Sequence, residues 1–392
     1  MNQISVNLET PVAAARARRD DSGTVFLDSE MTAKGVSILG SKPDLVLSGS
    51  DWQRLDRELN SRRRDGLGYP DGAAIGFVSF DGGFHFAFYD RLHLFSHEDQ
   101  RWINRPREFD PTSSGETEPL AFVAKMSKDQ FLGMVGRARE YIAAGDIYQV
   151  CLAHPFVADS ENPPAWEFFE RLRYLSPAPF SAYMNFGEVR IVSSSPECFL
   201  RMSGRDISTR PIKGTRPRKP DPESDRSSAS DLVTSPKEIA ELVIITDLER
   251  NDLGRVCEYG SVQATELLRL ESFEQVFHLV STVRGKLRAD VSHVRALRDC
   301  FPGGSISGAP KKRALEIIRE LEPYPRGIYT GAIGYFGYNE ESQFSIAIRT
   351  AVFEKGLASF HVGAGIVADS IPEKEWQETH DKALGLLLAA RR

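Results

Sequence analysis

The chain has 392 residues, of which 41% are hydrophobic and 27% are charged, and its formal net charge at pH 7 is −6. This composition is typical of a globular protein with a large core, and the acidic balance argues against nucleic acid as a partner. No run of about 18 apolar residues predicts a membrane span, and the N-terminus lacks the apolar region of a signal peptide. Four scattered cysteines fit neither a zinc site nor a small disulfide framework. We therefore expect a cytoplasmic protein.

The first third of the chain predicts strands and turns. Residues 1–70 are polar and broken by turn residues, with a helical pattern near residues 51–55. Residues 73–80 form an apolar run that ends in Asp-Gly-Gly, and the aromatic run 84–89 that follows predicts a β-hairpin. Residues 105–118 are rich in Pro, Ser, Gly and acids, so we expect an exposed connection within one architecture.

A helix and two strands are predicted next. Ser127 has capping-box spacing at the start of a helix that we expect to end at Gly145. Residues 147–152 and 190–200 read as strands, and the second carries Glu197 in apolar surroundings. An acid in that setting pairs with a base, caps a backbone group, or stays protonated as a general acid.

Residues 211–218 (Pro-Ile-Lys-Gly-Thr-Arg-Pro-Arg) predict a basic loop with a lysine at its sharpest point. Pro211 restricts the backbone on one side of Lys213, and Gly214 allows positive φ and close approach of a ligand on the other. The segment alone favours a solvated lysine, but a side chain held there would also be aimed at a ligand.

Two helices each present a Glu-x-x-Glu pair. Residues 235–254 begin with a capping box and carry Glu238 and Glu241 on one face. Residues 372–390, after predicted strands at 331–338, 343–353 and 357–367, carry Glu375 and Glu378. Four carboxylates around one cation suit Mg²⁺, although spacing alone favours solvated helix faces.

Several other residues are candidates for anion binding. The Gly-rich segment 302–311 precedes a helix, but it lacks the Gly-Lys-Ser/Thr ending of a nucleotide loop, which argues against a Walker-type ATPase. Arg349 in an apolar strand needs an anionic partner if it is buried. His278 in another apolar strand is more often a core residue than a catalyst, and Gly363 and Gly365 mark a bulge or close approach of a ligand. These features predict an enzyme acting on a small polyanion with Mg²⁺, and the spacing does not give the reaction.

The order of these motifs resembles the chorismate-utilising enzymes, which include anthranilate, aminodeoxychorismate, isochorismate and salicylate synthases. The resemblance is dense over residues 120–390 and thin over the first 120. The segments that carry it are 145–150, 195–197, 211–218, 247–254, 278–282, 301–311, 327–334, 363–369 and 375–382.

Within the family, Lys213 is similar to the lysine of the aminodeoxychorismate synthase component I branch, where anthranilate synthases have alanine. The resemblance implies that Lys213 attacks carbon 2 of chorismate while Glu197 protonates the departing hydroxyl at carbon 4. Ammonia then gives 4-amino-4-deoxychorismate, on the 4-aminobenzoate branch of folate synthesis. Gln149 stands where relatives that add water have a general-base lysine, which disfavours isochorismate and salicylate synthesis.

The resemblance also assigns the remaining site residues. It implies that Glu238, Glu241, Glu375 and Glu378 surround Mg²⁺ and that His278 lies beside the substrate ring. The residues implied to hold the two substrate carboxylates are Gly214, Thr215, Tyr329, Arg349, Gly363, Gly365 and Lys382. Cys151 and Cys198 depart from the Asn and Arg of many relatives.

The implied fold is α+β: a single large domain of two antiparallel β-sheets packed as a sandwich with helices outside. Residues 1–120 are expected to be a weakly matched part of this unit, and residues 121–392 the chorismate-binding catalytic region. No amidotransferase cysteine motif is present, so a separate glutamine amidotransferase subunit is expected to supply ammonia. We expect no tryptophan feedback and no fused lyase. Alternatives are an anthranilate synthase-like enzyme and an inactive chorismate-binding subunit.

Overall fold

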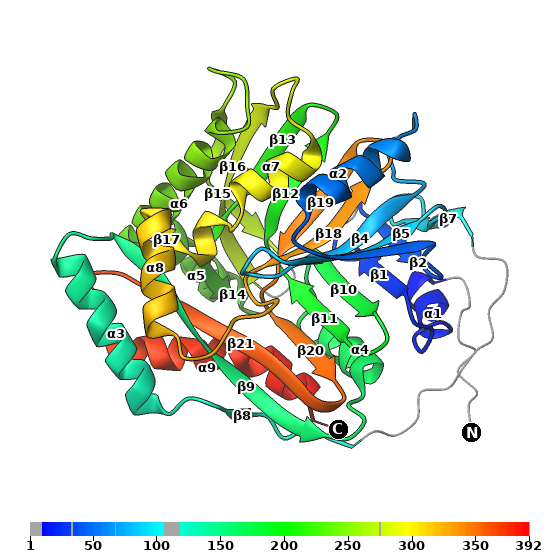
Figure 1. Ribbon diagram of the computed structural model, residues 1–392. Coiled ribbons are helices and arrows are strands. Elements are labelled where there is room, and N and C mark those ends of the chain that lie inside the picture. Colours follow the sequence, from blue (N-terminus) through cyan, green and yellow to red (C-terminus); the bar gives the residue numbers. More distant parts are fainter. Residues whose placement is uncertain (1–9, 33, 67, 106–117, 274–275, 392) are drawn as a thin grey trace.

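Two antiparallel β-sheets form the centre of the molecule, with helices around them (Figure 1). The computed structural model describes residues 10–391 apart from 33, 67, 106–117 and 274–275. The expected connection at residues 105–118 therefore lies, except for its two ends, outside the described residues. The predicted α+β class with two antiparallel sheets is confirmed.

The first sheet has eleven strands among the described residues. In order they are β17 (Gly308–Ala309), β9 (Gln149–Ser160), β21 (Gly356–Ile366), β20 (Thr350–Glu354), β11 (Arg190–Ser195), β10 (Phe180–Asn185), β1 (Thr24–Asp28), β2 (Val36–Gly40), β6 (His93–Ser96) and β7 (Arg101–Asn104), with β8 (Val123–Ala124) on β9.

The second sheet has ten strands in the described part of the chain. In order they are β14 (Ile212–Pro217), β16 (Val276–Lys286), β13 (Asp206–Arg210), β12 (Cys198–Ser203), β19 (Glu341–Ile346), β18 (Ala332–Gly337), β4 (Ala73–Val78), β5 (Phe84–Tyr89) and β3 (Leu45–Gly49), with β15 (Gln263–Ser272) on β16.

Helices cover the outer faces and the ends of both sheets. They are α1 (Pro11–Arg16), α2 (Trp52–Ser61), α3 (Lys128–Ala143), α4 (Ala165–Leu175), α5 (Pro222–Thr234), α6 (Pro236–Gly254), α7 (His293–Cys300), α8 (Lys311–Leu321) and α9 (Pro372–Ala389), with a 3₁₀ turn, η1 (Gly304–Ile306). No helix of the described residues is long and apolar enough to cross a membrane.

Successive side chains of each strand point to opposite faces of its sheet, so one face packs against the other sheet and the opposite face packs against helices. Val25 and Met184 of the first sheet pack against Ile75 and Ile333 of the second, so the two sheets share one core. Phe26, the next residue of β1, points to the opposite face, where α1, α4 and α9 pack. Helices α2 and α7 cover the second sheet in the same way. The result is a helix–sheet–sheet–helix sandwich.

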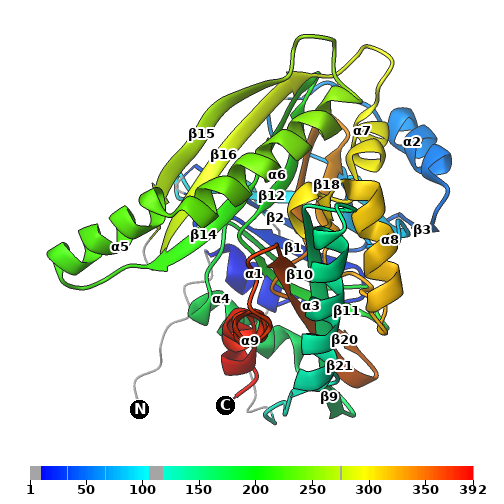
Figure 2. The ribbon, with the colours of Figure 1, turned by 90° about the vertical axis from the view of Figure 1, so that its left-hand side faces the viewer.

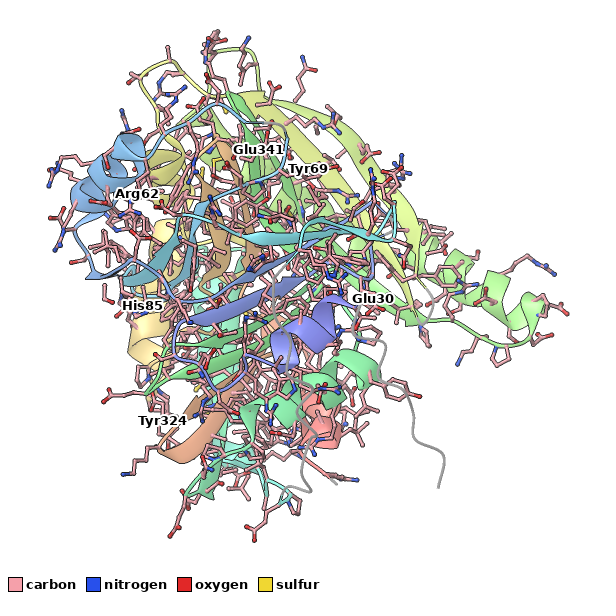
Figure 3. All side chains as sticks on the ribbon, turned by 90° about the vertical axis from the view of Figure 1, so that its right-hand side faces the viewer. Glu30, Arg62, Tyr69, His85, Tyr324 and Glu341 are labelled. Carbon is pink, nitrogen blue, oxygen red and sulfur yellow. The ribbon has the colours of Figure 1, made fainter. Side chains whose placement is uncertain are left out.

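Both sheets contain strands from the first 104 residues. The hairpin predicted at 73–80 and 84–89 is present as β4 and β5, whose residues pair from Ala73 with Tyr89 to Val78 with Phe84. Arg62, which caps α2, donates to Glu58 at 3.0 Å and lies 5.1 Å above the Phe88 ring (Figure 3). This part of the chain is therefore packed into the second sheet.

The predicted helix starts are present at their capping residues. The Ser127 hydroxyl accepts from the Gln130 backbone and the Gln130 side chain accepts from the Ser127 backbone, so the capping box of α3 is complete. At α6, the Ser235 hydroxyl accepts from the Glu238 backbone at 3.5 Å. Figure 2 shows α6 lying along β15 and β16, with α5 at its end.

Two of the predicted strands are wrong as single strands, because the chain changes sheet within each. The run 190–200 is β11 in the first sheet and β12 in the second, separated by Pro196 and Glu197. The run 343–353 is β19 in the second sheet and β20 in the first, and Arg349 has φ +50° between them. Apolar residues lie on both sides of each change, at 191–192 and 198–200 in the first run and at 346–348 and 351–353 in the second, which explains why the pattern predicts unbroken strands. Glu197 and Arg349 thus lie where the sheets exchange strands.

Candidate active site

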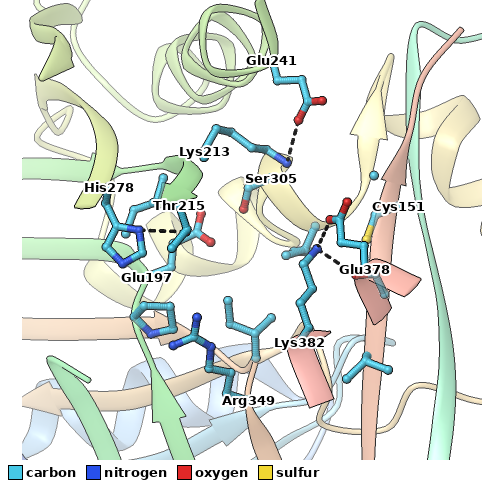
Figure 4. Close-up of a pocket in the computed structure, with 18 of the residues that line it drawn as sticks. Cys151, Glu197, Lys213, Thr215, Glu241, His278, Ser305, Arg349, Glu378 and Lys382 are labelled. Carbon is cyan, nitrogen blue, oxygen red and sulfur yellow. Dashed lines mark hydrogen bonds and ion pairs between the residues drawn. The ribbon is translucent and has the colours of Figure 1, made fainter. Parts of the chain in front are cut away.

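A cavity of about 520 Å³ lies at this junction of the two sheets (Figure 4). Every site residue predicted from the sequence except Glu375 lines it. These residues are Glu197, Lys213, Gly214, Thr215, Glu238, Glu241, His278, Tyr329, Arg349, Gly363, Gly365, Glu378 and Lys382. The cavity therefore gathers side chains that span 186 positions of the sequence, between Glu197 and Lys382 counted inclusively.

The predicted loop around Lys213 is wrong: the segment is β14, a strand that pairs with β16. Its register shifts between Lys213 and Thr215, with Gly214 at φ +74°. A Cβ at Gly214 would lie 2.5 Å from Leu232 and 3.0 Å from a Glu238 oxygen, so only glycine fits this bulge. The bulge directs Lys213 inward, where 17% of its side chain is exposed.

Lys213 faces the carboxylates of α6 and the floor of the cavity. Its Nζ lies 3.8 Å from Glu241 Oε2. A Cβ at Gly365 would lie 3.8 Å from Lys213 Nζ and 3.1 Å from Gln149 Nε2. Gln149 is 1% exposed, and neither of its amide atoms has a hydrogen-bond partner in the described part of the chain. The side-chain nitrogens of Lys213 and Gln149 thus both lie close to Gly365, which has no side chain to separate them.

Glu197 is held rigidly in the connection between β11 and β12. Its carbonyl accepts from the Ile346 backbone at 3.1 Å, and its own N–H donates to the Ser195 hydroxyl at 3.3 Å. Burial raises the pKa of its carboxyl, against the opposing influence of the Ser305 hydroxyl and of Lys213. A carboxyl in this environment retains its proton at higher pH than an exposed one, as a general acid requires.

The opposite wall supplies cations. Arg349 is half-buried, and desolvation lowers the pKa of its guanidinium; no carboxylate of the described residues lies within ion-pair distance of it. Lys382 donates to the Gly363 carbonyl at 3.0 Å and to Glu378 at 2.7 Å. The Tyr329 hydroxyl lies 3.0 Å from where a Cβ of Gly363 would be. The accessible backbone at Gly363 and the positive charge of Arg349, which has no carboxylate partner among the described residues, together suit a small anion.

His278 lies beside Thr215, whose hydroxyl is 3.0 Å from its Nδ1. Burial, with Arg349 nearby, lowers the pKa of His278 to about 4. The imidazole is therefore neutral near pH 7 and acts at most as a hydrogen-bonding or packing group there.

The four glutamates predicted to bind Mg²⁺ come from two helices, α6 and α9. Glu238, Glu241 and Glu378 line the cavity, and Glu375 is buried with an Oε2 atom that has no partner among the described residues. Burial raises the pKa of Glu241, with Glu238 and Glu378 adding to it, and burial also raises that of Glu375. The donor chemistry suits a hard cation. As placed, three of the carboxylates face Lys213, Lys237, Lys382 or Arg216, and no three described His, Cys, Asp or Glu side chains converge as metal ligands.

Some cavity residues escaped the sequence analysis. Ser305 comes from the Gly-rich segment 302–311, which the sequence presents as a possible anion loop. His361 lines the cavity and stacks on Tyr329 with ring centroids 5.5 Å apart. Glu249 does not line the cavity, but it is 3% exposed and its Oε1 accepts from the Gly304 N–H next to Ser305 at 3.1 Å. A serine in a Gly-rich turn, a histidine in an apolar strand and a glutamate in a polar helix end are each ordinary in sequence, so the pattern did not single out these three residues.

The fold and the cavity together describe an α+β protein with a cation-rich pocket for a small polyanion between two antiparallel sheets. A family model described as chorismate binding enzyme matches residues 50–387. The chain belongs to this chorismate-binding enzyme family.

Relatives in the family have two different names. Anthranilate synthase component 1 of Thermus thermophilus is 46% identical over 268 residues, which is 68% of this chain and 58% of the relative. Aminodeoxychorismate synthase component 1 of Bacillus subtilis strain 168 is 36% identical over 403 residues, covering 90% of this chain and 83% of the relative. The crystal structure of anthranilate synthase component I from Streptococcus pneumoniae TIGR4 superposes with a TM-score of 0.81 at 30% identity, covering 99% of both chains. The match spans less than two thirds of the Thermus relative.

Proposed function

We propose that this chain is an aminodeoxychorismate synthase component I, which converts chorismate and ammonia to 4-amino-4-deoxychorismate and water. The observation that carries the proposal is Lys213, an inward-pointing lysine on a bulged strand beside Glu197 in the anion pocket. The similarity to the Bacillus subtilis relative of that name supports it over most of the chain.

The walls suggest how chorismate is oriented. Chorismate carries two carboxylates, and Arg349 is a half-buried cation without a carboxylate partner among the described residues. We assign one carboxylate to Arg349, Tyr329 and the bare backbone at Gly363 and Gly365. The other faces the glutamate end of the cavity with Gly214, Thr215 and Lys382 nearby, and His278 packs beside the ring.

In the proposed reaction the amine of Lys213 attacks carbon 2 of chorismate. The two conjugated ring double bonds shift, and the hydroxyl at carbon 4 leaves as water after Glu197 gives it a proton. Ammonia then attacks carbon 4, both double bonds shift back, and Lys213 leaves as a neutral amine. The new ammonium group at carbon 4 returns a proton to the Glu197 carboxylate. Atoms and charge balance, and both side chains end in their starting forms.

We also propose that Glu238, Glu241, Glu375 and Glu378 hold Mg²⁺ when substrate is bound. The ion would supply positive charge for a substrate carboxylate and for the Glu241 carboxylate, which lies 3.8 Å from Lys213 Nζ. Titration calorimetry with Mg²⁺ in the presence of chorismate tests this. Heat of binding that is lost in Glu375→Gln supports the site, whereas unchanged binding contradicts it.

A separate glutamine amidotransferase subunit is proposed as the source of ammonia. The relatives at 46% and 36% identity are both named component 1. The partner is testable by adding glutamine in place of ammonium: the isolated chain is expected to make no product from glutamine.

An anthranilate synthase reaction is the second candidate, because the Thermus and Streptococcus relatives have that name. Incubation of the wild-type chain with chorismate, Mg²⁺ and an ammonium salt separates the two candidates. We expect 4-amino-4-deoxychorismate without pyruvate by chromatography and mass spectrometry. Anthranilate with equimolar pyruvate would establish the other reaction, and no turnover would favour an inactive chorismate-binding subunit.

A further inference from the structure

The Ser305 hydroxyl is a buried polar group without a partner on the wall of the cavity. Ser305 is 8% exposed, and apart from its influence on the nearby Glu197 carboxyl its Oγ has no hydrogen-bond partner among the described residues. Buried hydroxyls in native proteins are nearly always hydrogen-bonded. A buried hydroxyl on the wall of a ligand pocket is therefore available to donate a hydrogen bond to a negative charge that develops in the cavity.

The turn that carries Ser305 is fixed on both sides. The Gly304 N–H donates to Glu249 Oε1 at 3.1 Å, and the Ile306 carbonyl accepts from Arg326 at 3.1 Å. The Ser307 hydroxyl donates to the Gly303 carbonyl at 2.8 Å. With backbone anchors before and after it, the Ser305 side chain has little freedom to find another partner.

Ser305 points toward the two proposed catalytic side chains. In Figure 4 its hydroxyl projects into the space between Lys213 and the carboxyl of Glu197. It is close enough to Glu197 to stabilise the ionised carboxylate, which the backbone N–H of Ile212 does as well.

A buried general acid needs such a donor. When Glu197 releases its proton to the leaving hydroxyl, the negative charge remains at a 7% exposed position. A buried carboxylate is costly unless hydrogen bonds stabilise it. We propose that Ser305 is a positioning residue for Glu197, whose hydroxyl donates a hydrogen bond to the carboxylate that forms as the proton leaves. This role rests on the function proposed above.

Other charged groups also face Glu197 and remain in any Ser305 variant. Lys213 on β14 and Lys382 on α9 favour its ionised form. Glu249 on α6 and Glu197 disfavour each other's ionisation. Removing only the Ser305 hydroxyl therefore shifts the protonation equilibrium of Glu197 in one direction, toward the protonated carboxyl.

Ser305→Ala in the full chain tests the proposal, with chorismate and ammonium as substrates. We expect kcat to fall about 10- to 100-fold, as on loss of a hydrogen bond to a developing charge, while KM for chorismate changes less than about twofold. Activity needs protonated Glu197, so it declines as pH rises through the pKa of that carboxyl. The variant lacks a group that lowers this pKa, so the decline moves to higher pH.

Two further variants control for packing. Ser345→Ala removes another buried hydroxyl, which donates to the Ile333 carbonyl, and should leave kcat and the pH profile unchanged. Ser305→Cys keeps the volume but is a weaker donor, so its kcat should lie between those of wild type and Ser305→Ala. A Ser305→Ala variant with kcat within twofold of wild type, or one slowed without displacement of the pH profile, overturns the proposal. If wild type forms no 4-amino-4-deoxychorismate at any pH, the proposed function itself has failed.

Discussion

Arg349 is half-buried and Glu197 is buried, and both line the cavity. Arg349 has no carboxylate partner in the described part of the chain, and burial works against its charge. Glu197 is enclosed, and burial raises the pKa of its carboxyl. The charge of Arg349 is therefore stabilised when an anionic substrate binds, and Glu197 retains a proton that it can give to a leaving hydroxyl. These are the properties needed to expel a hydroxyl from a polyanion.

We predict that Arg349→Met weakens chorismate binding by about 2–3 kcal/mol, or roughly 30- to 150-fold, because a desolvated charge-assisted contact is lost. The ligand-free variant should be at least as stable as wild type, since an uncompensated half-buried charge is replaced by an apolar side chain. Thermal unfolding with and without chorismate measures both effects. A variant that unfolds earlier but binds normally would show that Arg349 is structural.

Motif resemblance singled out individual residues that lie together at one cavity, and their roles stay predictions. Lys213, Glu197 and Arg349 all line the cavity as expected. Ser305 was missed, because a serine after two glycines fits any turn. Its significance depends on a missing hydrogen bond, and that is visible only in three dimensions.

The edge strand β14 shows how one element positions the proposed nucleophile. The sequence favours a loop here because Pro211, Gly214 and Pro217 all interrupt regular structure. In the fold, β16 provides a partner edge, and the glycine becomes a bulge that turns Lys213 inward. Strand partners come from distant segments, so local composition did not reveal the pairing.

We predict that Gly214→Ala destabilises the protein by about 2–4 kcal/mol, from positive φ and the overlap with Leu232 together. Activity should fall further than stability, because Lys213 is displaced with the bulge. Gly260→Ala is the matched control: it has φ +78° with open space around its Cβ, so it isolates the backbone cost. Denaturant unfolding compares the two. Equal losses would show that the contact with α5 is unimportant.

The helices were predicted more accurately than the strands. Caps such as Ser127 and Ser235 are local signals and were found where expected. The sheet changes at Pro196–Glu197 and at Arg349 were not predicted, because apolar residues lie on both sides of each change and only the sheet order defines the break.

The whole molecule buries several histidines that must stay neutral. Burial is the main cause that lowers the pKa of His154, His278 and His361 to about 4 each. The unfolded chain titrates near 6.5, so it binds more protons than the folded chain between about pH 6.5 and 4. Glu249, whose pKa is raised to about 7, works in the opposite direction and offsets part of this effect.

We therefore predict that the free energy of unfolding falls by a few kcal/mol (order of magnitude) between pH 7 and pH 4.5. His154 does not line the cavity, and its Nε2 lies 3.0 Å from the Thr379 hydroxyl. In His154→Gln the decrease should be smaller by about 1–2 kcal/mol. Urea unfolding at the two pH values measures it. A variant with the full acid dependence of wild type would contradict the assignment.

The two-sheet architecture was expected from family resemblance and not from strand patterns alone. Alternation showed which segments are strands, but the order of strands in each sheet places neighbours far apart in sequence, such as β11 beside β20. These long-range pairings, with α9 packed against β21, bring residues 197, 213, 349 and 382 together at the cavity.

Lys213→Ala, assayed beside wild type with chorismate and ammonium, tests the central claim most directly. We predict that wild type forms 4-amino-4-deoxychorismate and that the variant loses this product while still binding chorismate. Intact-mass analysis of wild type quenched during turnover should show a chorismate-derived adduct on Lys213 that the variant lacks. A variant that keeps forming 4-amino-4-deoxychorismate near the wild-type rate would contradict a nucleophilic Lys213, and with it our account of how nitrogen reaches carbon 4.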